Sequence, residues 1–225
     1  MDSINTEITN KKERMEWLDA MRGFTMILVV AYHVAQMGFE QPVKESSSLS
    51  FLMLFRMPLF FFVSGFLAYK ASLTWKFETF LSLLGKKIRI QIIPTVVFFL
   101  FSCAALYPKF WPAVESNLQS PTKGGYWFTI VLLYMFMLYY VFCYLESKIG
   151  RKSWIPITLF FLLSLVAYET CYLPKLCWWA DGYRLKEPTT LLDDTSLIQL
   201  MKYMPFFLFG NIVRRYWNVA QHIRS

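Results

Sequence analysis

The chain has 225 residues, of which 56% are hydrophobic, 19% aromatic and only 17% charged, and its formal net charge is +8. This share of apolar residues is higher than in ordinary soluble domains. Apolar runs close to the roughly 20 residues that cross a bilayer recur along the whole sequence. The composition therefore excludes an ordinary soluble domain and indicates an all-α, polytopic membrane protein.

Six apolar runs predict a bundle of about six transmembrane helices. They cover Leu18–Gly38, Leu49–Tyr69, Ile88–Tyr107, Tyr126–Leu145, Trp154–Leu173 and Ile198–Val213. The sixth is the shortest, and it has Lys202 and Pro205 in its first turns. The basic segment Lys70–Lys87 can lie as a helix along the membrane interface. We expect a tail at residues 1–17, a membrane domain at 18–217 and a second tail at 218–225.

The basic residues predict the orientation of the chain. They gather before the first run, between the second and third, after the fourth and after the sixth. Lys and Arg are enriched in cytoplasmic loops, so both termini are predicted to be cytoplasmic. The positive charge is therefore a topology signal, and the expected surroundings are membrane lipid, with no nucleic-acid partner.

Arg22 and His33 lie eleven positions apart within the first run. This spacing is close to three turns of an α-helix, so both fall on one face, about 16 Å apart along the axis. Charged and titratable residues inside membrane spans usually mark functional sites, and His is the commonest general base. Asp19 lies three positions before Arg22 and can pair with it. The alternatives are an Arg22 that reaches the headgroups and a His33 that only bonds within the bundle.

Two further sets of residues extend this pattern. Arg56 lies in the second span, which it is predicted to enter from outside by a turn or two, near the depth of His33. Ser64 and Gly65 give the same span a small-residue surface suited to close helix packing. Lys86 and Arg89 are three apart at the cytoplasmic mouth of the third span, where such a pair suits a phosphate group. Positive-inside topology alone would also place them there.

The four cysteines do not define a disulfide framework. Cys103 and Cys143 lie in spans and are expected to be small buried hydrophobes. Cys171 and Cys177 flank the long outer loop, where an oxidising compartment allows a disulfide. The spacing of histidines and cysteines predicts no metal site.

The order of motifs resembles the integral membrane acyltransferase 3 family, whose members transfer acyl groups to sugars of surface glycans. The matching elements are Leu18–Gly23 with the spacing from Arg22 to His33, Met57–Phe66, the pair Lys86 and Arg89 before Pro94, Trp127 with Phe128, and Phe206–Gly210. The first two are the specific ones. The resemblance runs in order along nearly the whole chain.

Three departures from the family pattern stand out. The family usually has about ten spans, so six indicate its N-terminal part. The basic pair is usually two arginines, and here the first is Lys86. A His often precedes the Trp-Phe pair, and here Tyr126 stands before Trp127. Tyr126 and Trp127 are thus the expected acceptor-side residues.

The resemblance implies an O-acyltransferase of the bacterial inner membrane with no bound cofactor. Acyl-CoA, in the first place acetyl-CoA, is the expected co-substrate, and a sugar hydroxyl of a surface or lipid-linked glycan is the acceptor. His33 is the expected general base, Arg56 orients the acceptor or stabilises the oxyanion, and Asp19, Arg22, Lys86 and Arg89 bind the CoA end. The alternatives are a transporter or flippase, with Arg22 and His33 lining a pathway, and an inactive truncated membrane partner.

Overall fold

The computed structural model describes residues 16–39, 46–69, 73–120, 123–149, 154–170 and 195–217. Within these ranges every regular element is a helix, which confirms the predicted all-α class. The chain divides into two compact units, Met1–Arg56 and Met57–Ser225, and each is described by itself. Almost all of the two predicted tails, and the cysteines Cys171 and Cys177, lie outside the described residues.

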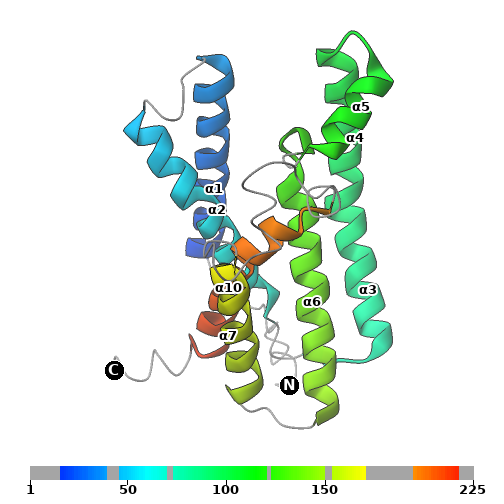
Figure 1. Ribbon diagram of the computed structural model, residues 1–225. Coiled ribbons are helices and arrows are strands. Elements are labelled where there is room, and N and C mark those ends of the chain that lie inside the picture. Colours follow the sequence, from blue (N-terminus) through cyan, green and yellow to red (C-terminus); the bar gives the residue numbers. More distant parts are fainter. Residues whose placement is uncertain are drawn as a thin grey trace, which may run out of the picture. The chain divides into compact units, whose positions relative to one another are not determined.

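The first unit contains α1 (Glu16–His33), which continues directly into a π-helical turn over Val34–Gly38. It also contains the first half of α2 (Ser47–Ala68). Figure 1 labels both helices. Leu18, Thr25 and Tyr32 are buried on α1. These residues are seven positions apart, about two helical turns, so they form one stripe along the helix. The predicted span Leu18–Gly38 is therefore helical over its whole length.

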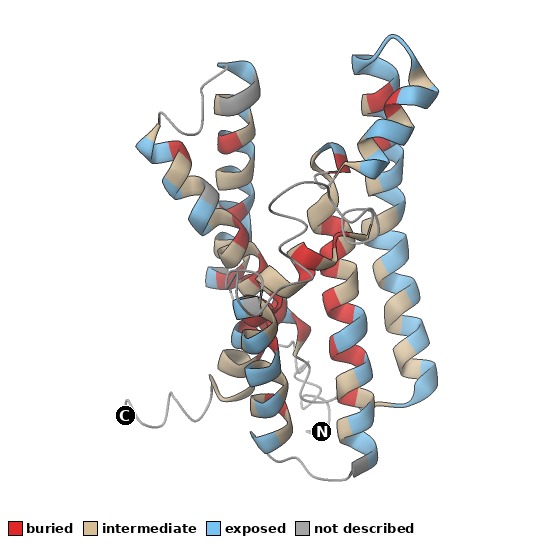
Figure 2. Cartoon of the chain, in the orientation of Figure 1, coloured by how far each residue is buried: buried red, intermediate tan, exposed pale blue. Residues whose placement is uncertain are grey.

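The core of the second unit is built from three helices and the end of α2. Helix α6 (Trp127–Ile149) contacts α10 (Leu197–Arg215), which packs along α7 (Trp154–Thr170). The fully buried side chains come mainly from α2, α6 and α10: Phe61, Phe66, Val131, Met135, Tyr139, Phe207 and Leu208. Figure 2 shows buried positions concentrated on these helices, whereas α4 (Ile93–Leu106) is mostly exposed. The exposed side chains of α4 are largely apolar, as expected of a lipid-facing helix.

Helices α2 and α10 approach each other closely at two glycines. A Cβ added to Gly65 would lie 1.8 Å from the carbonyl oxygen of Phe207, and one added to Gly210 would lie 2.0 Å from that of Phe62. The buried amide of Asn211 donates a 3.3 Å hydrogen bond to the carbonyl oxygen of Gly65. Only glycine allows this backbone contact. The predicted close packing at Ser64-Gly65 is thus confirmed.

The substitution Gly210→Ala is expected to destabilise the bundle by roughly 1–3 kcal/mol or more, because the two backbones must move apart to admit the methyl group. The matched control is Gly85→Ala in α3, where an added Cβ meets no atom within 4 Å. Thermal denaturation of the two variants in detergent measures the difference. Equal stability of both variants would contradict the close contact.

The third predicted span is part of a longer helix, which runs without a break over Phe77–Leu106. It consists of α3 (Phe77–Lys87), a π-helical turn (Ile88–Ile92) and α4 (Ile93–Leu106). The sequence predicted a span at Ile88–Tyr107 and, before it, a separate interfacial segment. Its 30 residues give about 45 Å of helix, longer than the hydrocarbon core of roughly 30 Å. The wider π turn just before Pro94 accommodates a residue that cannot donate a backbone hydrogen bond.

A short helix that the sequence did not predict follows α4. Helix α5 (Phe110–Gln119) packs against α4, around a small cluster of Phe99, Cys103 and Ala113. The chain then passes through a 3₁₀ turn, Lys123–Gly125, into α6. The side chain of Lys123 is buried and its ammonium group donates to the carbonyl oxygen of Leu118. The described parts of the connection between α4 and α6 are therefore structured.

Each of the six predicted runs coincides with a helix, but not all of these helices are long and apolar enough to cross a membrane. Among the described residues, three are long and apolar enough: Ser47–Ala68, Phe77–Leu106 and Trp127–Lys148. Helix α7 is apolar but shorter. Helices α1 and α10 carry charges in or near their ends, such as Arg22 and Arg215. Six spans and cytoplasmic termini stay predictions.

Candidate functional site

Three side chains of the first unit come together where α1 ends. The guanidinium carbon of Arg56 lies 3.4 Å from the centroid of the Tyr32 ring, which is buried. The imidazole of His33 stands edge-on to the same ring, with the centroids 5.6 Å apart and the planes at 84°. Arg56 and His33 are therefore both neighbours of one aromatic side chain. The structure therefore brings the two predicted catalytic residues together, with Tyr32 beside both.

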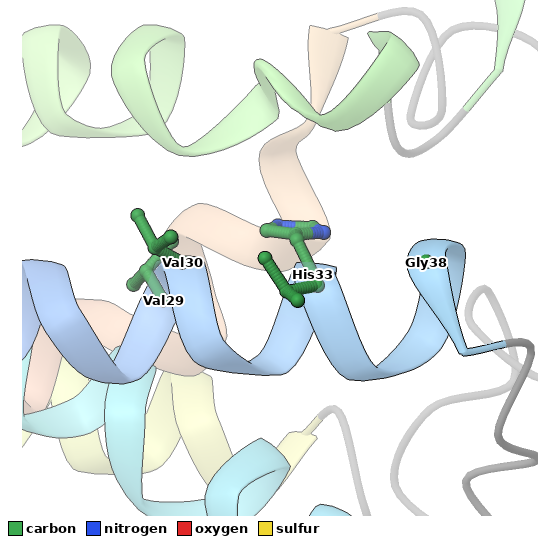
Figure 3. Close-up of a pocket in the computed structure, with 5 residues that line it drawn as sticks. Val29, Val30, His33 and Gly38 are labelled. Atoms are coloured by element: carbon green, nitrogen blue, oxygen red, sulfur yellow. The ribbon is translucent and has the colours of Figure 1, made fainter.

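A hollow of about 470 Å³ adjoins the imidazole. Its lining consists of Val29, Val30, His33, Val34 and Gly38, all from α1 and the π turn that follows it. Figure 3 shows the His33 ring projecting from the helix on the side where Val29 and Val30 also point. Apart from His33 these walls are apolar. The arrangement is one imidazole ring beside a shallow, open apolar surface.

The ion pair expected at the start of α1 is present. Arg22 Nη1 lies 3.7 Å from Asp19 Oδ1, one helical turn away. The Arg22 side chain is 59% exposed, whereas His33 is half-buried. The Arg22 end of the face that it shares with His33 is therefore the more exposed end. The reason is that Arg22 lies near the helix terminus, where a long side chain reaches outward.

The basic pair Lys86 and Arg89 belongs to the second unit. Both residues are exposed, and they lie where α3 passes into the π turn. Lys87, between them in the chain, instead sits with its ammonium nitrogen 3.6 Å from the centroid of the buried Phe136 ring on α6. Gln91 also faces α6 and donates a 2.6 Å hydrogen bond to the carbonyl oxygen of Thr129. These two contacts fix the rotation of the long helix about its axis relative to α6. Lys86 and Arg89 are left exposed.

The two predicted acceptor-side residues point into different surroundings. The hydroxyl of Tyr126 lies 3.2 Å from the hydroxyl of Ser102 on α4, and its ring stands edge-on to Phe99. Trp127 begins α6 and stacks on Tyr203 of α10, with ring centroids 5.5 Å apart. Trp127 is therefore part of the aromatic packing of the second unit, and Tyr126 joins α4 to the start of α6.

Sequence reasoning missed two features of these sites. Tyr32 was not among the predicted site residues, since no sequence signal predicts which ring a guanidinium will stack on. The π-helical turns were also missed, although one follows His33 directly and the other contains Arg89. Such turns are rare, and they occur frequently at functional sites. The signal available in the sequence was the Pro94 after the second of them.

Comparison with protein families identifies the chain. A family model of the acyltransferase 3 family, described as an acyltransferase domain, matches residues 15–222. No match was found among curated proteins. None was found among solved structures either. The match covers nearly all of the sequence, including the helices that carry His33, Arg56 and the pair Lys86 and Arg89. The chain therefore belongs to the acyltransferase 3 family of membrane acyltransferases.

Proposed function

We propose that this protein transfers an acyl group, in the first place acetyl, from acyl-CoA to a sugar hydroxyl of a surface or lipid-linked glycan. Membership of the acyltransferase 3 family gives the reaction class. The observation that carries the proposal for this chain is the cluster of His33, Tyr32 and Arg56 where α1 ends. The proposed location is the bacterial inner membrane, with acyl-CoA supplied from the cytoplasm.

The proposed reaction is a direct transfer. His33 removes the proton from the acceptor hydroxyl as its oxygen attacks the thioester carbonyl carbon. Arg56 stabilises the negative charge that develops on the carbonyl oxygen, as a fixed cation in a water-poor site can. The carbon–sulfur bond then breaks, the new ester bond remains, and the departing thiolate takes the proton from the His33 imidazolium. Atoms and charge balance, with free CoA and the acylated sugar as the products.

Cationic side chains are proposed to hold the phosphates of the donor, with separate candidates in each unit. In the first unit, Arg22 lies about 16 Å along α1 from His33, comparable to the reach of a pantetheine arm. Asp19 holds the Arg22 guanidinium at 3.7 Å. In the second unit, Lys86 and Arg89 are exposed and three positions apart along the helix. Charge-assisted hydrogen bonds from such groups suit phosphate oxygens.

For the acceptor, Tyr126 and Trp127 are the proposed contacts. Aromatic rings and hydroxyl groups suit sugars, which stack and form hydrogen bonds. Because the Tyr126 hydroxyl is engaged with Ser102, a sugar bound there has to share or replace that hydrogen bond. Acceptor binding at Tyr126 would therefore change the contact between α4 and the start of α6.

The experiment that tests the function follows radiolabelled acetyl groups. Membranes containing the protein are supplied with labelled acetyl-CoA and with lipid-linked or surface glycan, and the label in the glycan is counted. Ester-linked label above that of membranes without the protein is the expected result. Movement of glycan across the membrane without label transfer would instead indicate a transporter, and neither activity in well-inserted protein would indicate an inactive partner.

The phosphate-binding role predicts a specific kinetic change. The double substitution Lys86→Ala and Arg89→Ala should raise the KM for acetyl-CoA roughly tenfold or more and change kcat less, because ground-state binding of the donor is lost. Lys76→Ala, at the residue that precedes α3, is the matched control and should leave KM unchanged. A KM for acetyl-CoA that is the same in both variants would remove these two residues from the donor site.

A further inference from the structure

We infer that Tyr32 is a positioning residue for the acyl-transfer site, because its ring holds the Arg56 guanidinium in place beside His33. This role depends on the proposed function, since it concerns the same reaction. The contact joins two helices of the first unit, α1 and the beginning of α2. Neither composition nor spacing predicts it.

The geometry is that of a stacked cation. The distance of 3.4 Å between the guanidinium carbon and the ring centroid is van der Waals contact, well inside the range of about 6 Å for cation–π attraction. The Tyr32 ring is only 5% exposed, so the attraction acts with little competition from solvent. Desolvation strengthens such contacts, so the ring favours one orientation of the long, flexible Arg56 side chain.

Stacking also determines what Arg56 can do. A guanidinium is planar and carries its N–H donors in that plane. When a ring covers its face, the donors point parallel to the ring and past its edge. Tyr32 and His33 are consecutive residues of one rigid helix, which fixes the distance from the stacked group to the imidazole. A cation held in this way needs little reorganisation when charge develops on the carbonyl oxygen, which is the condition for effective electrostatic stabilisation.

The stripe on α1 explains why the ring keeps its own position. Tyr32 is the third member of the buried row that includes Leu18 and Thr25. Its place is therefore set by packing of the helix, and Arg56 adapts to it. The His33 ring lies edge-on to Tyr32, so the same aromatic side chain limits the rotation of the imidazole.

The test combines two substitutions of the ring with removal of the cation. Tyr32→Phe keeps the stacking face and should retain turnover within roughly threefold. Tyr32→Leu removes the face and should lower kcat roughly tenfold, with the KM for acetyl-CoA nearly unchanged. Phe24→Leu is the matched control, because Phe24 is an aromatic residue of α1 that is 50% exposed and outside the site. It should behave as wild type.

A double-mutant cycle decides whether Tyr32 acts through Arg56. Adding Tyr32→Leu to Arg56→Met should cause no further loss of turnover, since the partner of the ring is already gone. Additive losses would overturn the positioning role, as would equal losses in Tyr32→Phe and Tyr32→Leu. If Tyr32→Leu does not fold, Tyr32→Met provides the same comparison with a more adaptable side chain.

Failure of this role is distinguishable from failure of the proposed function. Wild-type protein that moves label to glycan while Tyr32→Leu matches it would overturn only the role of Tyr32. Wild-type protein that moves no label from acetyl-CoA would overturn the acyl-transfer function, and the positioning role with it.

Discussion

The substitution His33→Ala is expected to lower acyl transfer by about 10²–10⁴-fold, to the background of the assay. Without the imidazole, no group at the end of α1 takes the proton from the acceptor hydroxyl, so the attacking oxygen stays a poor nucleophile. Donor binding should persist, because the groups proposed to hold the CoA phosphates are untouched. The measurement is the rate of label transfer from acetyl-CoA to glycan in membranes with matched amounts of protein.

His222→Ala is the control of the same chemistry, since His222 is the other histidine of the chain. It lies in the predicted C-terminal tail and should leave transfer unchanged. Both variants should insert into the membrane as the wild type does. Transfer by His33→Ala at the wild-type rate would exclude His33 as the general base.

The second large effect concerns stability and does not depend on the proposed reaction. Arg215 on α10 donates two hydrogen bonds to Glu146 on α6, of 2.6 Å and 2.9 Å, and both side chains are only 13% exposed. Glu146→Gln keeps the size of the side chain but leaves a largely buried guanidinium without its counter-charge. Breaking such a pair typically costs about 3–5 kcal/mol. Thermal denaturation in detergent should therefore show a large loss of stability.

Two further variants identify the cause of that loss. Glu115→Gln, at an exposed position of α5, is the matched control and should cost little. Replacing both partners, with Glu146→Leu and Arg215→Met together, should restore much of the stability, because no buried charge is then left unpaired. If Glu146→Gln is as stable as Glu115→Gln, the ion pair does not hold α6 to α10.

The helices could be predicted from the sequence because the bilayer imposes a simple rule. A run of about 20 apolar residues has to form a helix to satisfy its backbone groups in lipid. For this reason each predicted run coincides with a helix in the structure. Pairings within one helix could also be predicted, such as Asp19 with Arg22, because a separation of three residues places both side chains on one helix face. The small residue Gly65 likewise marked a close helix contact.

Contacts between helices were not predictable in the same way. The stacking of Arg56 on Tyr32 and the pairing of Glu146 with Arg215 depend on how each helix is rotated about its axis, and in a nearly uniformly apolar helix no amphipathic pattern reveals that rotation. The long helix over Phe77–Leu106 escaped prediction for a different reason. Its basic part resembled an interfacial loop in composition, while its backbone continues through a π turn into the apolar part.

The most direct measurement counts two products of purified wild-type protein in lipid vesicles that are supplied with acetyl-CoA, with and without a glycan acceptor. The proposed mechanism predicts one free CoA thiol for each ester formed, with both products requiring the acceptor and both lost in His33→Ala. No release of CoA in the presence of acceptor by correctly inserted protein, or release without any ester on the glycan, would contradict it.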